Sequence, residues 1–197
     1  GIDMLEQGGN AADAATATIL ALQVTDHGAC CIGGEVPALI FDAQAGQVRS
    51  LSGMGRAPRS QQAIDWYMEN GIPGDGDIKM APVPSVVDLC TTLLQRYGTT
   101  TFEAAVAATL ILLDEGDEEW HPKLAKTLRR LVESEQRATG SREEKIQAAS
   151  DRFYGREGAP GDVADEIEGF WIERGGFLRR GDLAAHQTLI EAPVSID

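Results

Sequence analysis

One arginine in this 197-residue sequence has the residue type and the setting for substrate chemistry. Arg56 lies in a segment with a glycine on either side of its methionine, Ser52-Gly53-Met54-Gly55-Arg56-Ala57-Pro58. A guanidinium can hold a carboxylate through two parallel N–H···O bonds, and flanking glycine lets a ligand approach the backbone. The segment therefore predicts a carboxylate-binding arginine. The alternative is that Arg56 pairs with one of the 31 acidic residues and only fixes its own loop.

The other side chains capable of chemistry do not form a recognisable set. The three histidines, His27, His121 and His186, have neither the spacing of metal ligands nor that of a catalytic pair. The three cysteines also lack metal spacing, and Cys90 has apolar neighbours at helical spacing, which predicts a core position. We therefore predict no catalytic residue, no metal site and no organic cofactor in this chain.

Two glycine-rich turns must position the arginine segment. Gly8-Gly9 end a first helix, and Asn10 then begins a second one with Asp13 at its third position, where a carboxylate accepts unpaired N–H groups. We interpret Asn10 and Asp13 as cap residues. The helix that follows is rich in alanine and threonine, which predicts close packing. Gly33 and Gly34 come just before a β-prone run, and either allow backbone to approach a cleft or make a plain turn.

The remaining pattern predicts an α/β fold with a helical middle. Strands are expected at residues 35–42 and 47–51, followed by a helix at 60–70 and a Gly/Pro/Asp-rich functional or mobile loop at 72–84. Further helices are expected at 84–97, 102–113, 122–136 and 163–174. Residues 137–150 are expected to form a solvated helix or loop, and residues 188–196 an extended segment. Residues 1–197 are interpreted as a single domain, with a helical subregion at about 84–187.

The charge and the hydropathy pattern exclude several classes of partner. The net charge of −14 argues against nucleic acid and against an anionic membrane, because both need a basic surface. The apolar runs are too short to span a bilayer. The acidic composition and the lack of a visible leader favour a cytoplasmic location, with a periplasmic or secreted protein as the alternative if a leader has been removed.

Five stretches, taken in order and spacing, resemble the large chain of the gamma-glutamyltransferase family of N-terminal-nucleophile hydrolases. They cover nearly the whole sequence, although each is short. They are Gly8-Gly9-Asn10-Ala11-Ala12-Asp13, Ile32-Gly33-Gly34 with Ala45-Gly46, Leu51 to Pro58, Val83-Pro84-Ser85 with Gln95 to Gly98 and Phe102, and Phe153-Tyr154-Gly155 with Gly175 to Leu178, Asp182-Leu183-Ala184 and Pro193.

The resemblance implies an αββα sandwich built from two chains of one precursor. In that family the precursor cuts itself, and the new N-terminal threonine of the small chain attacks an amide carbonyl. A threonine hydroxyl needs an adjacent base, which a free α-amine can provide only at a chain terminus. This chain begins with Gly1, so the resemblance implies that the nucleophile lies on a small catalytic chain, which would be the obligate partner.

The arginine segment departs from the classical pattern of the family. Met54 stands where classical transferases carry the arginine that holds the glutamyl α-carboxylate, and Arg56 comes two residues later. The Gly-Arg-Ala-Pro version is similar to a divergent branch with oxamate-type hydrolases and acylases, which puts γ-glutamyl specificity in doubt. The resemblance favours substrate contact by Arg56, with Gly33, Gly34 and Gly55 in loops near the site.

Three further departures lie close to the shared motifs. Glu35 and Ser85 replace glycines of the family, and nothing in the sequence explains either. His186 stands where the family usually carries an aromatic residue.

The expected function is that of the large-chain part of a gamma-glutamyltransferase-like amidohydrolase. Such an enzyme cleaves a small-molecule amide through an acyl-threonine intermediate, with hydrolysis or γ-glutamyl transfer as the outcome. A small-amide hydrolase of the oxamate type and a cephalosporin-acylase-like enzyme are the alternatives within enzymes. A truncated paralogue without catalysis, binding a partner or a small anion, is the alternative outside them.

Overall fold

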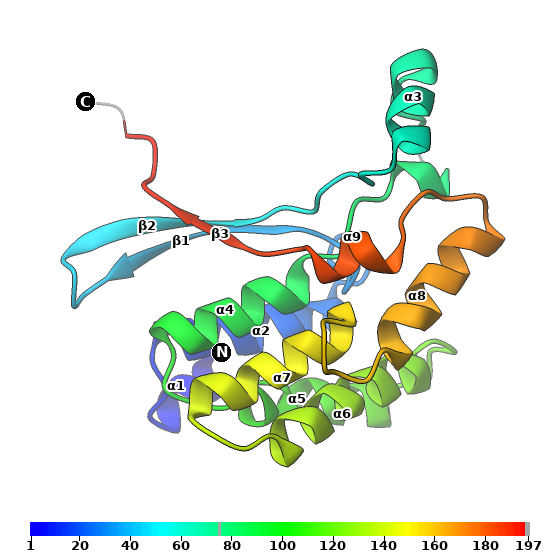
Figure 1. Ribbon diagram of the computed structural model, residues 1–197. Helices are drawn as coiled ribbons and strands as arrows, with labels where there is room; N and C mark the ends of the chain where they lie inside the picture. Colours follow the sequence, from blue (N-terminus) through cyan, green and yellow to red (C-terminus); the bar gives the residue numbers. More distant parts are fainter. Residues whose placement is uncertain (75, 196–197) are drawn as a thin grey trace.

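The computed structural model describes residues 1–74 and 76–195, which form a small antiparallel sheet and a helical layer (Figure 1). The sheet contains β1 (Val36–Asp42), β2 (Gln47–Gly53) and β3 (Leu189–Glu191). The helices are α1 (Ile2–Glu6), α2 (Ala11–Thr25), α3 (Gln61–Asn70), the 3-10 turn η1 (Ile78–Met80), α4 (Val86–Tyr97), α5 (Phe102–Glu115), α6 (His121–Arg137), α7 (Arg142–Tyr154), α8 (Asp162–Glu173) and α9 (Arg180–Ala184).

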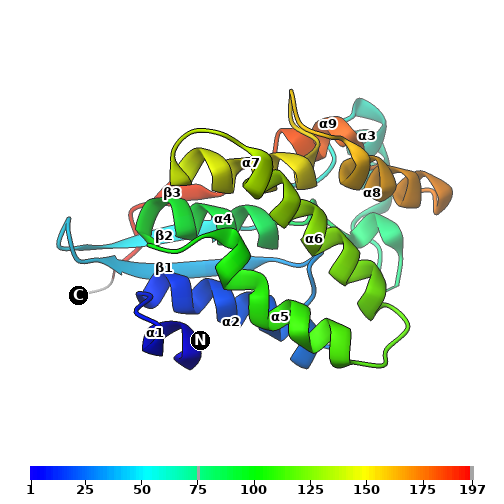
Figure 2. The same cartoon turned by 90° about the horizontal axis from the view of Figure 1, so that it is seen from below.

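The sheet lies over one face of the helical layer (Figures 1 and 2). Strand β2 is central, and in its register Leu51 pairs with Ala38 on one side and with Ile190 on the other. Leu51 points toward the helices and packs with Leu89 and Leu93 of α4. The C-terminal strand therefore joins the sheet through the edge of β2 that the N-terminal hairpin leaves open.

The main core lies among α4, α5, α6 and α7, and includes fully buried Leu94, Phe102, Leu131 and Ile146. Cys90 is also fully buried there, which confirms its predicted core position. This layer is the largest body of buried apolar surface in the described chain, and the sheet rests on it through α4.

The segment at residues 137–150 was expected to be solvated, and this expectation was wrong for one face. Helix α7 begins after Ser141, whose hydroxyl accepts from the Glu144 amide while the Glu144 carboxylate accepts from the Ser141 amide, a reciprocal capping box. Its polar residues face solvent, but Ile146 and Ala149 are fully buried. Apolar residues at a spacing of three and four are enough to dock a mostly charged helix.

The start of α2 is capped as predicted, and the cap also ties two helices together. The Asn10 side chain accepts from the Ala12 and Asp13 amides, and the Asp13 carboxylate accepts from the Asn10 amide at 2.9 Å. Asp13 is fully buried, and it also accepts from the Thr99 amide at 2.9 Å and the Thr100 amide at 3.1 Å. The cap of α2 therefore fixes the turn that leads into α5.

None of the helices in residues 1–74 and 76–195 is both long enough and apolar enough to cross a membrane.

Candidate functional site

Arg56 lies in the loop that follows β2, with its side chain exposed to solvent. Its guanidinium makes no hydrogen bond and no ion pair with any residue that the structure describes. The alternative prediction, that Arg56 pairs with an acidic residue and only fixes its loop, therefore finds no partner in the described chain. By contrast, the neighbouring Arg59 donates to the Gly181 carbonyl at 2.9 Å and lies 3.4 Å from the Asp182 carboxylate.

The backbone around Arg56 is held on both sides. The Val83 amide donates to the Arg56 carbonyl at 3.0 Å, and the Gly55 amide donates to Glu35 Oε1 at 2.6 Å. A Cβ atom at Gly55 would collide with the Val83 carbonyl oxygen and would lie 2.8 Å from Pro82 Cβ. Only glycine allows this approach. The loop therefore packs closely against residues 82–83, and the Arg56 side chain is exposed to solvent.

Ser85 joins the two glycine-containing loops that the sequence analysis placed near the site. It is fully buried, and its hydroxyl lies 2.6 Å from the Gly53 carbonyl oxygen and 3.0 Å from that of Gly34. The Ser85 amide also donates to Gly34 O at 3.1 Å. The structure thus brings Gly34, Gly55 and Arg56 together around Glu35 and Ser85, the two residues for which sequence reasoning had no role.

A buried polar cluster lies at the start of α4, immediately after Ser85. Asp88 Oδ1 accepts from Arg156 Nη2 at 2.6 Å, and Asp88 Oδ2 accepts from the Thr188 amide at 2.6 Å. The Tyr154 hydroxyl accepts from the Asp88 amide and donates to the Pro84 carbonyl. Sequence reasoning missed this cluster, although an aspartate within the apolar run Val86–Cys90 was a signal for a paired buried charge.

His186 completes the cluster. Its ring is almost fully buried and lies 5.4 Å from the Tyr154 ring, and neither ring nitrogen has a hydrogen-bond partner among the described residues. Burial lowers the pKa of His186; the Asp88 carboxylate opposes this shift, and the positive charges of Arg156 and Arg56 add to it. The imidazole is therefore neutral at pH 7, and the charge of Arg56 acts on it.

The outer face of the sheet carries several exposed apolar side chains, together with Ser50, Ser52 and Glu191, and is not covered by any helix of the described chain (Figure 1). Leu39, Phe41, Val48 and Leu189 are exposed by 70%, 64%, 41% and 43%. They occupy alternate positions on the face opposite to α4, as the register of the three strands requires. An uncovered apolar face of this kind is typical of a sheet that receives another layer.

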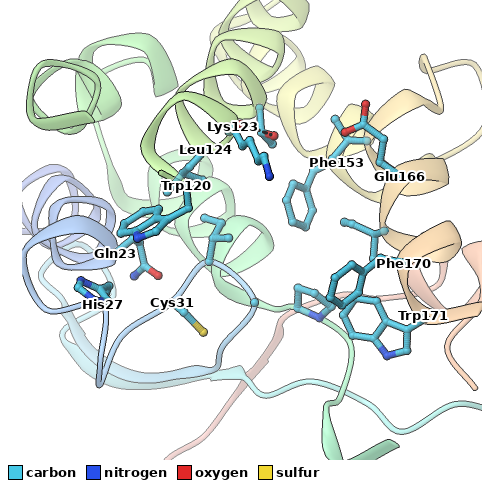
Figure 3. Close-up of a pocket in the computed structure, with 16 residues that line it drawn as sticks. Gln23, His27, Cys31, Trp120, Lys123, Leu124, Phe153, Glu166, Phe170 and Trp171 are labelled. Carbon is cyan, nitrogen blue, oxygen red and sulfur yellow. Dashed lines mark hydrogen bonds between the residues drawn. The ribbon is translucent and has the colours of Figure 1, made fainter. Parts of the chain in front are cut away.

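A separate apolar hollow of about 590 Å³ lies between the C-terminal part of α2, α6 and α8 (Figure 3). Trp120, Phe153, Phe170 and Trp171 line it, with Lys123 and Glu166 among its few charged side chains. Gly33, which was predicted to lie near the site, lines this hollow, whereas Arg56 does not. Across residues 1–74 and 76–195, no group of three histidine, cysteine or acidic side chains could hold a metal ion.

The sequence model of the family described as Gamma-glutamyltranspeptidase matches residues 1–121, which is more than half of the chain. This chain belongs to the gamma-glutamyltranspeptidase family. The matched range includes both glycine-containing loops, Glu35, Arg56 and the cluster residue Asp88.

Curated members of the gamma-glutamyltranspeptidase family show the same relationship. The glutathione hydrolase proenzyme of Bacillus subtilis subsp. natto is 29% identical over 121 residues, which is 59% of this chain and 21% of that protein. The glutathione hydrolase-like YwrD proenzyme of Bacillus subtilis is 25% identical over an alignment of 215 positions, covering 98% of this chain and 41% of that protein. The chain thus spans between one fifth and two fifths of the length of these relatives.

Solved structures of the gamma-glutamyltranspeptidase family have the same fold. Cephalosporin acylase from Bacillus halodurans superimposes with a TM-score of 0.74 at 25% identity, over 99% of this chain and 41% of that one. A gamma-glutamyltranspeptidase from Pseudomonas nitroreducens, complexed with L-DON, superimposes with a TM-score of 0.74 at 22% identity, over 100% of this chain and 64% of that one. The predicted fold class, the large-chain part of an N-terminal-nucleophile hydrolase, is therefore confirmed.

Proposed function

We propose that this chain is the large-chain part of an amidohydrolase whose nucleophile is the N-terminal threonine of a small chain from the same precursor. Membership of the gamma-glutamyltranspeptidase family and the proenzyme nature of its curated relatives support this proposal. The threonine hydroxyl attacks the amide carbonyl carbon, and its proton passes through the α-amine to the departing amine. Water then hydrolyses the acyl-threonine ester and frees the nucleophile, or an amine acceptor takes the acyl group.

The observation that carries the substrate part of the proposal is the guanidinium of Arg56, which lies on a fixed loop and has no partner among residues 1–74 and 76–195. An arginine without a protein partner keeps all the N–H donors of its guanidinium available for a ligand carboxylate. The loop is held by Glu35 and Val83, so the guanidinium starts from a restricted set of positions. We therefore assign the carboxylate of a small amide substrate to Arg56.

The outer face of the sheet is the proposed docking surface for the small chain. Two sheets pack face to face at about 10 Å when both present apolar side chains. Leu39, Phe41 and Val48 supply such side chains, and the small residues Ser50 and Ser52 lie on the same face between β1 and β3. A second sheet on this face would complete the αββα sandwich and place its edge beside the Arg56 loop at the end of β2.

The substrate class is tested on the complete, processed enzyme with γ-glutamyl-p-nitroanilide, oxamate and neutral acyl amides. The Gly-Arg-Ala-Pro loop favours a small amide that carries a carboxylate over a γ-glutamyl compound, and we expect turnover of oxamate. Turnover of γ-glutamyl-p-nitroanilide alone would overturn the small-amide assignment. A precursor that neither cuts itself nor turns over any of these amides would overturn the enzyme assignment and support a truncated, non-catalytic paralogue.

Arg56→Ala tests the assigned contact. We expect it to raise KM for the carboxylate substrate by roughly 10- to 100-fold, because a charge-assisted hydrogen bond contributes about 1.5–3 kcal/mol. Arg59→Ala is the matched control, since Arg59 lies in the same loop but is already bound to Asp182 and Gly181. An unchanged KM in Arg56→Ala would show that Arg56 does not hold the substrate.

A further inference from the structure

Glu35 differs from an ordinary surface acid in what it binds. Its side chain is exposed, and it comes just before the first residue of β1. Its carboxylate nevertheless reaches across to the loop after β2 and accepts the Gly55 amide at 2.6 Å. A hydrogen bond from a backbone N–H to an ionised carboxylate is about twice as strong as a neutral one. A single side chain thus joins the entry to β1 with the loop that carries Arg56.

The bond acts on the Met54–Gly55 peptide group, one residue before Arg56. The amide of Gly55 points to Glu35, and the carbonyl of Arg56 accepts from the Val83 amide at 3.0 Å. These two bonds hold the peptide groups before Gly55 and after Arg56, so together they restrict the stretch of backbone from which the Arg56 side chain leaves. Without Glu35, the Val83 bond and the close approach of Gly55 to Pro82 would still hold one side of the loop, but the Gly55 amide would lose its described partner.

Ser85 supports the same arrangement from the buried side. Its hydroxyl lies within hydrogen-bond distance of two backbone carbonyl oxygens, those of Gly34 and Gly53. Gly34 immediately precedes Glu35, and Gly53 lies two residues before Gly55. The hydroxyl can donate its proton to one of them at a time. Ser85 therefore keeps the two backbone segments at the separation that the Glu35 side chain spans.

We propose that Glu35 is a positioning residue that sets the orientation of Arg56 by binding the Gly55 amide, with Ser85 holding the two loops in register. This inference deepens the proposed function and rests on it, because it takes Arg56 as the residue that holds the substrate carboxylate. Glu35 acts through the backbone of residues 55–56 and does not itself touch the substrate. Its effect on catalysis is therefore expected only where Arg56 is present.

The experiment is a double-mutant cycle on the processed enzyme with a carboxylate-bearing amide substrate. We expect Glu35→Ala to raise KM about fivefold to tenfold with kcat changed by less than about twofold. The reason is that a displaced Arg56 guanidinium weakens substrate binding more than it slows the chemical step. In the Arg56→Ala background, Glu35→Ala should change KM by less than about twofold. An equal increase of KM in both backgrounds would overturn the positioning role.

Two further variants separate the hydrogen bond from the charge. Glu35→Asp keeps the charge but is one methylene too short to reach the Gly55 amide, and it should raise KM as Glu35→Ala does. Glu35→Gln keeps the length and an oxygen acceptor, and it should retain KM within about threefold of the wild type. An unchanged KM in Glu35→Asp would contradict the proposal, even if Glu35→Ala failed to fold or to process.

Hydrogen exchange of the Gly55 amide gives a readout that does not depend on activity. We expect this amide to exchange faster in Glu35→Ala and Glu35→Asp than in the wild type. Asp42→Ala is the matched control, because Asp42 accepts the Gln44 and Ala45 amides at the opposite end of β1; it should change neither KM nor the exchange at Gly55. Unchanged exchange at Gly55 in both Glu35 variants would overturn the proposal.

These measurements also separate the inference from the function on which it rests. If Arg56→Ala leaves KM unchanged, the substrate contact of Arg56 is wrong, whatever Glu35 does to the loop. If Arg56→Ala raises KM and Glu35→Asp does not, the proposed function stands and the positioning role of Glu35 is wrong.

Discussion

Asp88 and Arg156 form a hydrogen-bonded ion pair of 2.6 Å at the junction of α4 with the segment that follows α7. Their side chains are exposed by only 8% and 16%. The Asp88 carboxylate also receives the Thr188 amide, and Arg156 donates to the His186 carbonyl at 2.7 Å. This pair therefore links the helical layer to the chain that leads into β3.

Removing one member of this pair should be costly. We expect Arg156→Met to lower the free energy of unfolding by about 3–5 kcal/mol, because Asp88 would remain buried without its cation. Adding Asp88→Asn to this variant should recover part of the loss. Arg137→Met is the control, since Arg137 is 77% exposed at the end of α6, and its Tm should equal that of the wild type. Thermal and chemical unfolding measure both effects, and equal Tm values for Arg156→Met and Arg137→Met would contradict this prediction.

Asp13 should contribute stability that depends on pH. Burial raises the pKa of Asp13, but hydrogen bonds from the Asn10 backbone, the Thr99 side chain and the Thr100 and Thr99 amides together lower it below 3.8. The folded state therefore prefers the ionised form, and the contribution is fully present above pH 3.8 and is lost as the pH falls through the lower folded pKa. We expect Asp13→Asn to cost about 2–3 kcal/mol at pH 7.

The measurement for Asp13 is chemical unfolding of wild type and Asp13→Asn from pH 7 to pH 3. The difference between the two should stay constant down to about pH 4 and shrink below it. A difference that does not vary with pH would show that the carboxylate charge contributes nothing. Asp26→Asn serves as the control, because Asp26 is an exposed residue at the other end of the same helix.

His186 should make the fold less stable under mildly acidic conditions. Its folded pKa lies below 6.5 because of burial and the positive charges of Arg156 and Arg56, with Asp88 acting in the opposite direction, while the Tyr154 ring covers one side of it. The unfolded chain therefore binds more protons between the folded pKa and pH 6.5, and stability falls as the pH is lowered through this window.

His186→Phe tests this dependence. The variant removes two buried nitrogens that lack partners in the described chain and keeps an aromatic ring against Tyr154. We expect its stability to equal or exceed that of the wild type at pH 7.5 and to exceed it more clearly at pH 5.5. Equal pH dependence of the two proteins in urea unfolding would show that His186 does not titrate in this window.

The three cysteines should react in a fixed order. Burial raises the pKa of Cys90 to about 12, while Cys31 is exposed and Cys30 is half-buried. Because the thiolate is the reactive form, iodoacetamide at pH 8 should label Cys31 first, Cys30 more slowly and Cys90 only after unfolding. Mass spectrometry of the labelled peptides measures the order. Labelling of Cys90 in the native protein at the rate of Cys30 would contradict its placement in the core.

Local sequence signals predicted most of the fold. Asn10 and Asp13 at a helix start, Thr101 before α5 and glycine after α3 and α4 each carry a known capping or stop function, and the structure has helix ends at these places. The packing of α7 was harder to predict, because its buried residues are few among many charges. Its docking depends on the facing surfaces of α4 and α6, which no local pattern records.

The candidate site was predictable at Arg56 but not around it. A glycine-flanked arginine can be recognised from residue type and neighbours alone. The bonds that fix it connect residues 20 to 51 positions apart, as between Glu35 and Gly55 or Ser85 and Gly34. Such contacts follow from strand register and helix docking. The sequence alone therefore offered no explanation for Glu35 and Ser85.

The pairing of β3 with β2 also sets an order of assembly. Strands β1 and β2 are joined by a short turn and can pair early, whereas β3 is tied through Thr188 to Asp88, 100 positions earlier in the chain. Closing so long a loop costs more chain entropy than closing the hairpin, and it becomes favourable only after the helices between have packed. The third strand is therefore expected to join last in folding, so the apolar sheet face reaches its full width only when the helical layer is complete.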